Sequence, residues 1–327
     1  MKLVVARSAV VAVASALVGL TGPAALAASG GPPEMRITPA EHVPGAGSAM
    51  ILSATLVAER VVAVGDHGVV LLSDDGGHSY RQARSVPVSS TLTSVAFVDA
   101  SHGWAVGHWG VVLRTEDGGE TWTLQRSELS VDQPLFSVYF KDEHQGWAVG
   151  LWSLMLHTVD GGAHWSKVTL PAPAGSKTAD RNLYRIFGNA MGELFIACEQ
   201  GRVMRSTDNG ASWRYLETGY NGSFWTGVAL SDGVVLVGGL RGTIYRSSDG
   251  GATWTASNYT FNSSITDMIQ LADSTVVAVA LDGVSLISHD DGESFSGTQR
   301  PDRAPLTAVS PSPAGTAVLF SANGPIG

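Results

Sequence analysis

The sequence predicts an all-β fold: a seven-bladed β-propeller built from four-stranded antiparallel blades. Two observations support this prediction. An eight-residue box, with Asp third, Gly fifth and an aromatic residue eighth, occurs six times along the chain. Short alternating strands with no helical period precede and follow each box. Four such strands in every repeat of about 42 residues are typical of a propeller blade.

The six boxes, called Asp boxes below, are nearly identical in pattern and spacing. Consecutive box aspartates lie 42, 43, 48, 41 and 41 residues apart. An Asp side chain can accept hydrogen bonds from its own turn, and Gly adopts positive φ at little cost. We therefore predict a structural role for all six: Asp75, Asp117, Asp160, Asp208, Asp249 and Asp290.

The first 27 residues have the pattern of a secretory signal peptide. Lys2 and Arg7 precede an apolar run over 9–20, and Ala25-Leu26-Ala27 fits a small-residue cleavage site. We expect cleavage near Ala27 and a periplasmic or secreted mature protein. Residues 28–327 are then predicted to form a single propeller domain.

Composition narrows the partners of this domain. The formal net charge is −9 and no basic run occurs, so nucleic acid and anionic membrane surfaces are poor partners. No segment after the signal peptide is long and apolar enough to cross a membrane. The single cysteine, Cys198, allows no internal disulfide and aligns with small residues, so we expect it to be buried. We expect a monomer with no cofactor and no metal, because no metal-ligand spacing occurs.

Residues 91–126 illustrate the predicted blade. Strands are expected over 93–97, 104–107 and 111–114, followed by the box and a fourth strand from Trp122. A Pro- and Ala-rich insertion over 170–181 is predicted to be a surface loop. The same pattern places six blades at about 47–83, 91–126, 134–169, 181–216, 224–257 and 264–298.

The chain continues past the sixth blade without another box. Residues 306–309 and 316–320 predict two further strands, whereas residues 34–38 have no partner ahead of the first blade. We expect 34–46 to complete a seventh blade with 305–327, which would remove exposed sheet edges. A six-bladed ring with loose tails is the alternative.

Antiparallel topology separates two faces of the propeller. The Asp boxes lie on one face; the turns between second and third strands lie on the other, with the connections between blades. At these turns the equivalent residues differ, which favours an individual function there. The predicted partner-binding residues are His67, His108, Trp109, Trp152, Tyr184, Arg185, Gln200, Trp225 and Arg241.

Two of those residues, Tyr184 and Trp225, belong to a predicted aromatic rim around the central channel. The innermost strands start on the same face, and we expect their first residues to form this rim: Leu92, Phe136, Tyr184, Trp225 and Ile265. Arg185 follows Tyr184 directly. Either the rim is a binding surface or its rings merely cap the channel.

One stretch resembles a known family. The segments Phe97-Val98-Asp99, Gly103–Gly107 and Gly110–Trp122 are similar to the photosystem II stability/assembly factor family of Asp-box (BNR) propellers, and 140–150 repeats the first half. The resemblance spans about 50–298. It implies a seven-bladed, non-enzymatic assembly factor that binds a membrane-protein subunit. Exported members also occur in bacteria without photosynthesis. We therefore expect an assembly or stability factor that binds a membrane or envelope protein subunit or peptide.

Two alternatives remain. Asp boxes also occur in sialidases and other secreted glycosidases, so a secreted glycoside hydrolase is the second hypothesis. Such an enzyme needs two carboxylates about 5–9.5 Å apart. Glu199 and Asp282 lie on the plausible face but in blades two apart, and no catalytic residue is predicted. In the third hypothesis the propeller is structural and its partners bind the Asp-box face.

Overall fold

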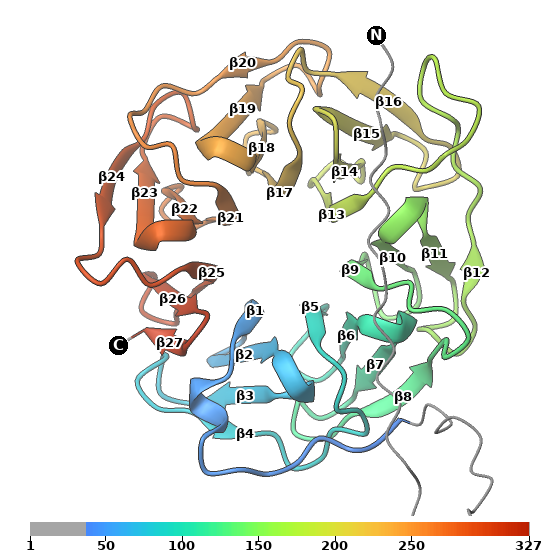
Figure 1. Cartoon of the computed structure of the whole chain (residues 1–327), viewed down its shortest axis with the longest axis vertical. Coiled ribbons are helices and arrows are strands. Elements are labelled where there is room, and N and C mark those ends of the chain that lie inside the picture. The colour runs from blue at the N-terminus through green and yellow to red at the C-terminus, as the bar shows by residue number, and fades with distance from the viewer. Residues whose placement is uncertain (1–36, 327) are drawn as a thin grey trace, which may run out of the picture. The chain divides into compact units, whose positions relative to one another are not determined.

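The computed structural model describes residues 37–326, which belong to one compact unit. The predicted signal peptide and residues 28–36 lie outside the described residues. Seven antiparallel sheets follow one another in a ring around a central axis (Figure 1). Every strand pairs with its neighbour in the sequence, as in a propeller. The prediction of an all-β, seven-bladed propeller is therefore confirmed. No helix among residues 37–326 is long and apolar enough to cross a membrane.

The first four blades are four-stranded. Blade 1 contains β1 (Ile51–Val57), β2 (Arg60–Gly65), β3 (Val70–Ser73) and β4 (Arg81–Gln82). Blade 2 contains β5 (Leu92–Phe97), β6 (Gly103–Gly107), β7 (Val112–Thr115) and β8 (Thr123–Arg126). Blade 3 contains β9 (Leu135–Phe140), β10 (Gly146–Gly150), β11 (Met155–Thr158) and β12 (Ser166–Lys167). Blade 4 contains β13 (Leu183–Gly188), β14 (Leu194–Cys198), β15 (Arg202–Ser206) and β16 (Arg214–Glu217).

Two further four-stranded blades and one shorter blade complete the ring. Blade 5 contains β17 (Phe224–Ala229), β18 (Val235–Gly239), β19 (Thr243–Ser247) and β20 (Thr255–Ala256). Blade 6 contains β21 (Ile265–Gln270), β22 (Val276–Ala280), β23 (Val284–Ser288) and β24 (Ser296–Gln299). Blade 7 contains β25 (Leu306–Pro311), β26 (Ala317–Ser321) and β27 (Gly324–Ile326). Six short 3-10 turns accompany the strands: η1 (Ala46–Ser48), η2 (Asp66–Gly68), η3 (His108–Gly110), η4 (Leu151–Ser153), η5 (Leu240–Gly242) and η6 (Leu281–Gly283).

Blade 7 differs from the predicted closure. Its three described strands all come from the C-terminal part of the chain. Ile37 and Thr38, the described end of the predicted N-terminal strand, lie outside any strand. Thr38 instead meets Ser89, in the connection from blade 1 to blade 2. The N-terminal segment meets blade 7 at η1, which contacts β27. Edge pairing is limited there because Pro325 has no N–H to donate.

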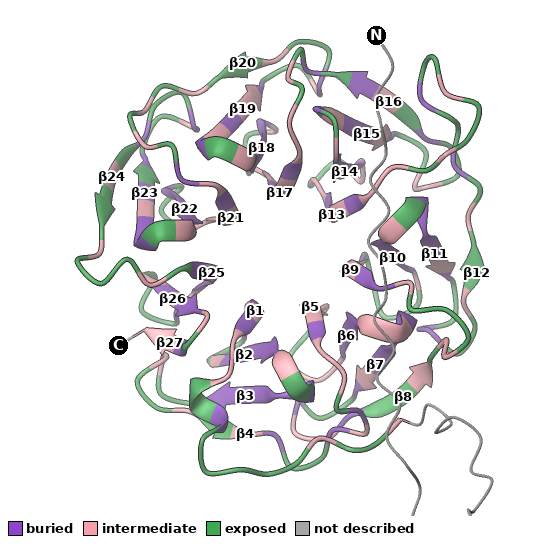
Figure 2. Ribbon diagram, viewed as in Figure 1, coloured by how far each residue is buried: buried purple, intermediate pink, exposed green. Residues whose placement is uncertain are grey.

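The hydrophobic core is divided into seven clusters, one at each seam between neighbouring blades. Figure 2 shows the buried strands around the ring. The largest clusters join blades 1 and 2, blades 5 and 6, and blades 3 and 4. The smallest joins blades 6 and 7 through four buried residues, Val277, Val279, Leu306 and Val309. Buried apolar contact is therefore distributed around the ring, and it is smallest at the seam between blades 6 and 7.

The outer strands alternate in length. β4, β12 and β20 have two residues each, whereas β8, β16 and β24 have four. After β4 the chain crosses to blade 2, where Ser85 bridges to Thr121. After β20 it crosses to blade 6, where Asn258 bridges to Ser294. These crossings explain why the seams between blades 1 and 2 and between blades 5 and 6 bury so many side chains.

Candidate functional site

The two faces of the propeller are separated as expected. On one face the blade 2 Asp box meets the first turn of its blade, where the Gly118 N–H donates to the Ser101 carbonyl at 3.0 Å. On the other, the connection between blades 2 and 3 meets η3, where the Glu128 N–H donates to the Trp109 carbonyl at 2.7 Å. We call the second surface the turn face.

The Asp boxes are saturated with internal hydrogen bonds. Thr253 donates its N–H and its hydroxyl to the two carboxylate oxygens of Asp249, at 2.9 and 2.6 Å. The Ser247 hydroxyl donates to the same carboxylate and accepts from the Gly251 N–H. The Thr253 hydroxyl is the main reason why the pKa of Asp249 is lowered to about 2. At neutral pH this carboxylate has no proton to give, which suits a turn and not a general acid.

The turn face carries six strained positions. In blades 1–6 the middle residue of the turn between second and third strands has φ between 53° and 61°. These residues are His67, Trp109, Trp152, Gln200, Arg241 and Asp282, the same six positions at which the sequence varies. Left-handed backbone costs a non-glycine residue about 1–2 kcal/mol. The side chains at these positions therefore lie where the backbone conformation favours glycine.

Hydrogen bonds to the next connection fix several of these turns. The N–H of Trp109 donates to Asp132, that of Trp152 to Asn182, and that of Arg241 to Ser264. Trp152 is 58% exposed, which is unusual for so large an apolar side chain. Trp109 is partly buried against the core between blades 1 and 2. Its neighbour His108 faces Asp132, with Nδ1 and Oδ2 3.5 Å apart.

The predicted aromatic rim requires a correction. Leu92 and Ile265 are fully buried at the first position of their strands. Phe136, Tyr184 and Trp225 occupy the second position, where a β-bulge interrupts the pairing of each inner strand. The equivalent residues in blades 2 and 6 are Thr93 and Thr266. The aromatic arc therefore covers blades 3, 4 and 5 only.

Within this arc, Phe136 and Tyr184 stack with ring centroids 5.6 Å apart. Both side chains are partly buried, so the pair leaves some apolar ring surface exposed beside the innermost strands. Trp225, in blade 5, has a partly buried side chain.

Arg185 belongs to a channel network that the sequence prediction missed. Its guanidinium lies 3.9 Å from Asp267, two blades away. Asp267 is only 5% exposed; it accepts from the Thr226 hydroxyl at 3.4 Å and from the Val309 N–H at 3.1 Å. This one carboxylate thus meets groups from blades 4, 5 and 7. Burial raises the pKa of Asp267, although Arg185 opposes the shift.

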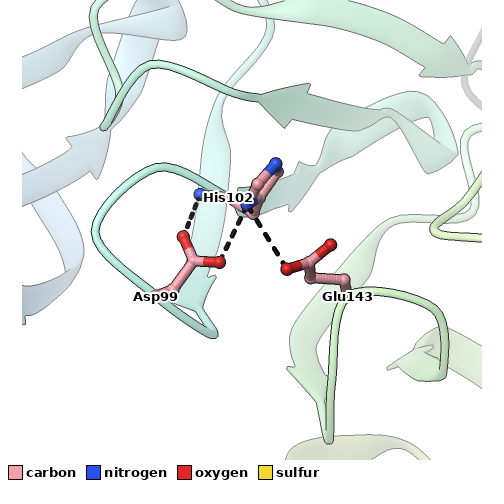
Figure 3. A group of neighbouring side chains, drawn as sticks. All are labelled: Asp99, His102 and Glu143. Carbon is pink, nitrogen blue, oxygen red and sulfur yellow. Dashed lines mark hydrogen bonds and ion pairs between the residues drawn. The ribbon is translucent and has the colours of Figure 1, made fainter.

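On the opposite face, three side chains form a group that could hold a metal ion. Asp99, His102 and Glu143 offer ligand atoms within 4.8 Å of one another (Figure 3). Spacing did not reveal the group, because Glu143 comes from the next blade. His102 Nδ1 lies 2.8 Å from Asp99 and 3.9 Å from Glu143. The His102 N–H is the main reason why the pKa of Asp99 is lowered to about 2. The Asp99–His102 contacts are therefore also accounted for by the turn itself.

The two carboxylates considered for hydrolysis have separate surroundings. Glu199 accepts from the Asn182 side chain at 3.1 Å. Asp282 lies exposed in η6, and its nearest hydrogen-bond donor is the Ser263 hydroxyl at 3.5 Å. Neither shares a partner with the other, so the described residues show no paired acid and base at these positions.

Known proteins resemble both the sequence and the fold. The family described as photosynthesis system II assembly factor YCF48 matches residues 82–175 and 124–304. No curated protein matches the chain. A solved structure of YCF48 bound to D1 peptide shares 17% identity at a TM-score of 0.67, over 87% of this chain and 93% of that one. The structure of YCF48 from Cyanidioschyzon merolae shares 15% sequence identity at a TM-score of 0.68, over 87% of this chain and 97% of that one.

An enzyme has a similar fold. A streptogramin B lyase shares 12% identity at a TM-score of 0.69, over 85% of this chain and 92% of the lyase. Structural likeness at such identities shows the propeller fold alone. The family match is of a different kind, since it covers more than half of the chain. The chain therefore belongs to the family of the photosynthesis system II assembly factor YCF48.

Proposed function

We propose that this protein is an exported, non-enzymatic propeller that binds a membrane or envelope protein subunit and assists the assembly or stability of its complex. The observation that carries the proposal is the turn face. There, equivalent strained positions hold unlike side chains, among them the exposed Trp152. An aromatic side chain exposed on a rigid element is a typical binding anchor. A family member binds a D1 peptide, which supports a protein partner here as well.

A capture experiment tests the face as well as the function. Envelope extract would be passed over the wild-type protein and over the double variant Trp109→Ala/Trp152→Ala. We expect the double variant to lose a subunit that the wild type retains. The matched control is Val159→Ala/Met191→Ala, because both residues are strongly exposed, at 67% and 72%, and lie on the Asp-box side. Loss in the control with retention in the tryptophan variant would place the partner on the Asp-box face instead.

Export is tested separately. Residues 1–27 fused to alkaline phosphatase should yield active enzyme, because that enzyme folds only outside the cytoplasm. A fusion that lacks these residues should be inactive. Equal activity of the two fusions would contradict a signal peptide.

The glycosidase hypothesis has its own test. The purified protein would be incubated with aryl glycosides and polysaccharides, and we expect no turnover. Turnover that Glu199→Gln abolishes would replace the proposed function with hydrolysis.

A further inference from the structure

Blade 5 has an open corner on the turn face. A cavity of about 330 Å³ lies there, lined by Tyr220, Tyr245, Tyr259 and Phe261, with Arg241 and Asn262 at its margin. The cavity exists because β20 stops at Ala256, having paired only with Tyr245 and Arg246. The chain then leaves for blade 6 at Asn258 and does not cover Thr243 and Ile244 with an outer strand.

The long outer strands close the same corner in other blades. In blade 2 the Arg126 side chain donates to the Gly110 carbonyl. In blade 6 the Arg300 N–H donates to the Gly283 carbonyl at 2.9 Å. Blade 3 has a short outer strand, but its corner residue Ser153 donates twice to the Arg181 carbonyl, at the end of the 170–181 insertion. Blades 1 and 5 have neither a long outer strand nor such an insertion at this corner.

In blade 1 the corner is filled by a linear segment of this chain, residues 37–43, which contains neither helix nor strand. The Ala40 N–H donates to the Val86 carbonyl at 3.0 Å. His42 Nε2 lies 2.9 Å from the Ala83 carbonyl, and the Val43 N–H donates to the Gln82 side chain at 3.0 Å. The chain thus shows that this kind of corner accommodates a peptide.

Blades 1 and 5 correspond closely at this corner, except that blade 5 has one residue fewer between Ser257 and Asn258 than blade 1 has between Ala83 and Ser85. Ser85 and Asn258 make the same bridge to the next Asp box. A Cβ at Gly68 would collide with the Val88 carbonyl, as one at Gly242 would collide with the Phe261 carbonyl. The residues that hold the segment in blade 1 therefore correspond to residues lining the cavity in blade 5: Gly68 to Gly242, Gln82 to Ala256, Ala83 to Ser257 and Val86 to Tyr259. Within residues 37–326 the Tyr259 carbonyl accepts no hydrogen bond, whereas that of Val86 accepts one from the segment.

We propose that the open corner of blade 5 binds a linear peptide segment of a partner, with a proline and a carboxylate in its sequence. The proposal rests on the proposed partner-binding role of the turn face and names the kind of segment bound. Aromatic walls select proline, whose ring packs on them and whose backbone is already extended. Arg241 is exposed at the cavity margin and forms no ion pair with any described residue, so a carboxylate complements it.

The test uses a library of random heptapeptides displayed on phage and panned on the intact protein. We expect enriched sequences to contain proline and Asp or Glu. A synthetic peptide of the consensus should bind about five- to tenfold more weakly to Arg241→Gln. That difference should disappear when the carboxylate of the peptide is replaced by an amide. Ala256→Trp fills the corner from an exposed position and should abolish binding without changing the melting temperature.

Arg214→Gln is the matched control, since Arg214 is also an exposed arginine but lies in β16 and does not line the cavity. It should leave peptide binding unchanged. No enrichment, or binding that survives both Arg241→Gln and Ala256→Trp, would overturn the inference. A different result would contradict the proposed function. In that result, the variant Trp109→Ala/Trp152→Ala retains the envelope partner. Loss of that partner in the tryptophan variant, with no peptide enriched, would leave the proposed function standing and remove only the peptide site.

Discussion

The exposed tryptophan of blade 3 illustrates a conflict between backbone preference and side-chain role. Trp152 has φ of 53° and packs little, so its ring contributes little to folding. We expect Trp152→Gly to raise the free energy of unfolding by about 0.5–1 kcal/mol, because glycine relieves the left-handed strain but loses some entropy. Urea denaturation measures the change. Trp109→Gly is the control: it should destabilise, since Trp109 packs on the core. A destabilised Trp152→Gly would show that the exposed ring has a structural role.

The surroundings of Asp267 determine how much its replacement should change the stability of the fold. Its carboxylate is buried and meets Arg185, Thr226 and Val309 from three other blades. Asp267→Ala should cost about 1–3 kcal/mol, because it leaves the buried Val309 N–H without its acceptor. Asp267→Asn should cost less, because an amide oxygen can still accept from Val309. Equal melting temperatures for wild type and Asp267→Ala would show that the network contributes nothing.

At the scale of elements, the Asp boxes should make the fold sensitive to acid. The pKa of Asp160 is lowered to about 2, first by the backbone N–H of His164, and that of Asp208 to about 2, first by the Ser212 hydroxyl. Both lie below the ordinary value of 3.8. Their contribution to stability is therefore full above about pH 4 and is lost as the pH falls toward 2.

Melting temperatures measured between pH 5 and pH 2.5 test this. The wild type should lose stability steadily over that range. Asp208→Asn should be less stable at pH 5 but should lose less on acidification. Parallel curves for the two proteins would contradict the assignment.

The seams between blades predict where the ring opens first. Four buried residues join blades 6 and 7, far fewer than at the seam between blades 1 and 2. Local opening free energy follows buried apolar contact. We expect amides of β25 and β26 to exchange with deuterium faster than those of β5 and β6, measured by mass spectrometry at neutral pH. Slower exchange in blade 7 would contradict this ordering of the seams.

For the molecule as a whole, the sequence predicts the repeating parts and misses the parts that break the repeat. The box residues and the alternating strands identify the blades because the same hydrogen bonds recur at fixed spacing. The alignment of Cys198 with small residues predicts that its side chain is buried, and the structure confirms this. The bulge in each inner strand shifts the pairing by one residue, which explains why Leu92 and Ile265 were placed on the rim.

Other features of the site had weak signals or none. The charge of Asp267, in a strand whose equivalents carry Ser94 and Ser137, is a signal that could have found the channel network. The positive φ at Trp152 has no such signal, because none of the six equivalent residues is a glycine that would mark a left-handed position. The open corner of blade 5 was also invisible, since the repeat is as long in blades with short outer strands as in those with long ones.

The crossing of the chain after β4 and after β20 has a consequence for biogenesis. Because part of one blade completes the seam with the next, the smallest unit that can bury its apolar surface there is a pair of blades. A chain emerging N-terminus first could therefore consolidate in successive pairs, each protected before the next one appears. The odd seventh blade would dock last, and only then would the aggregation-prone apolar flank of blade 1 be shielded from other newly made chains.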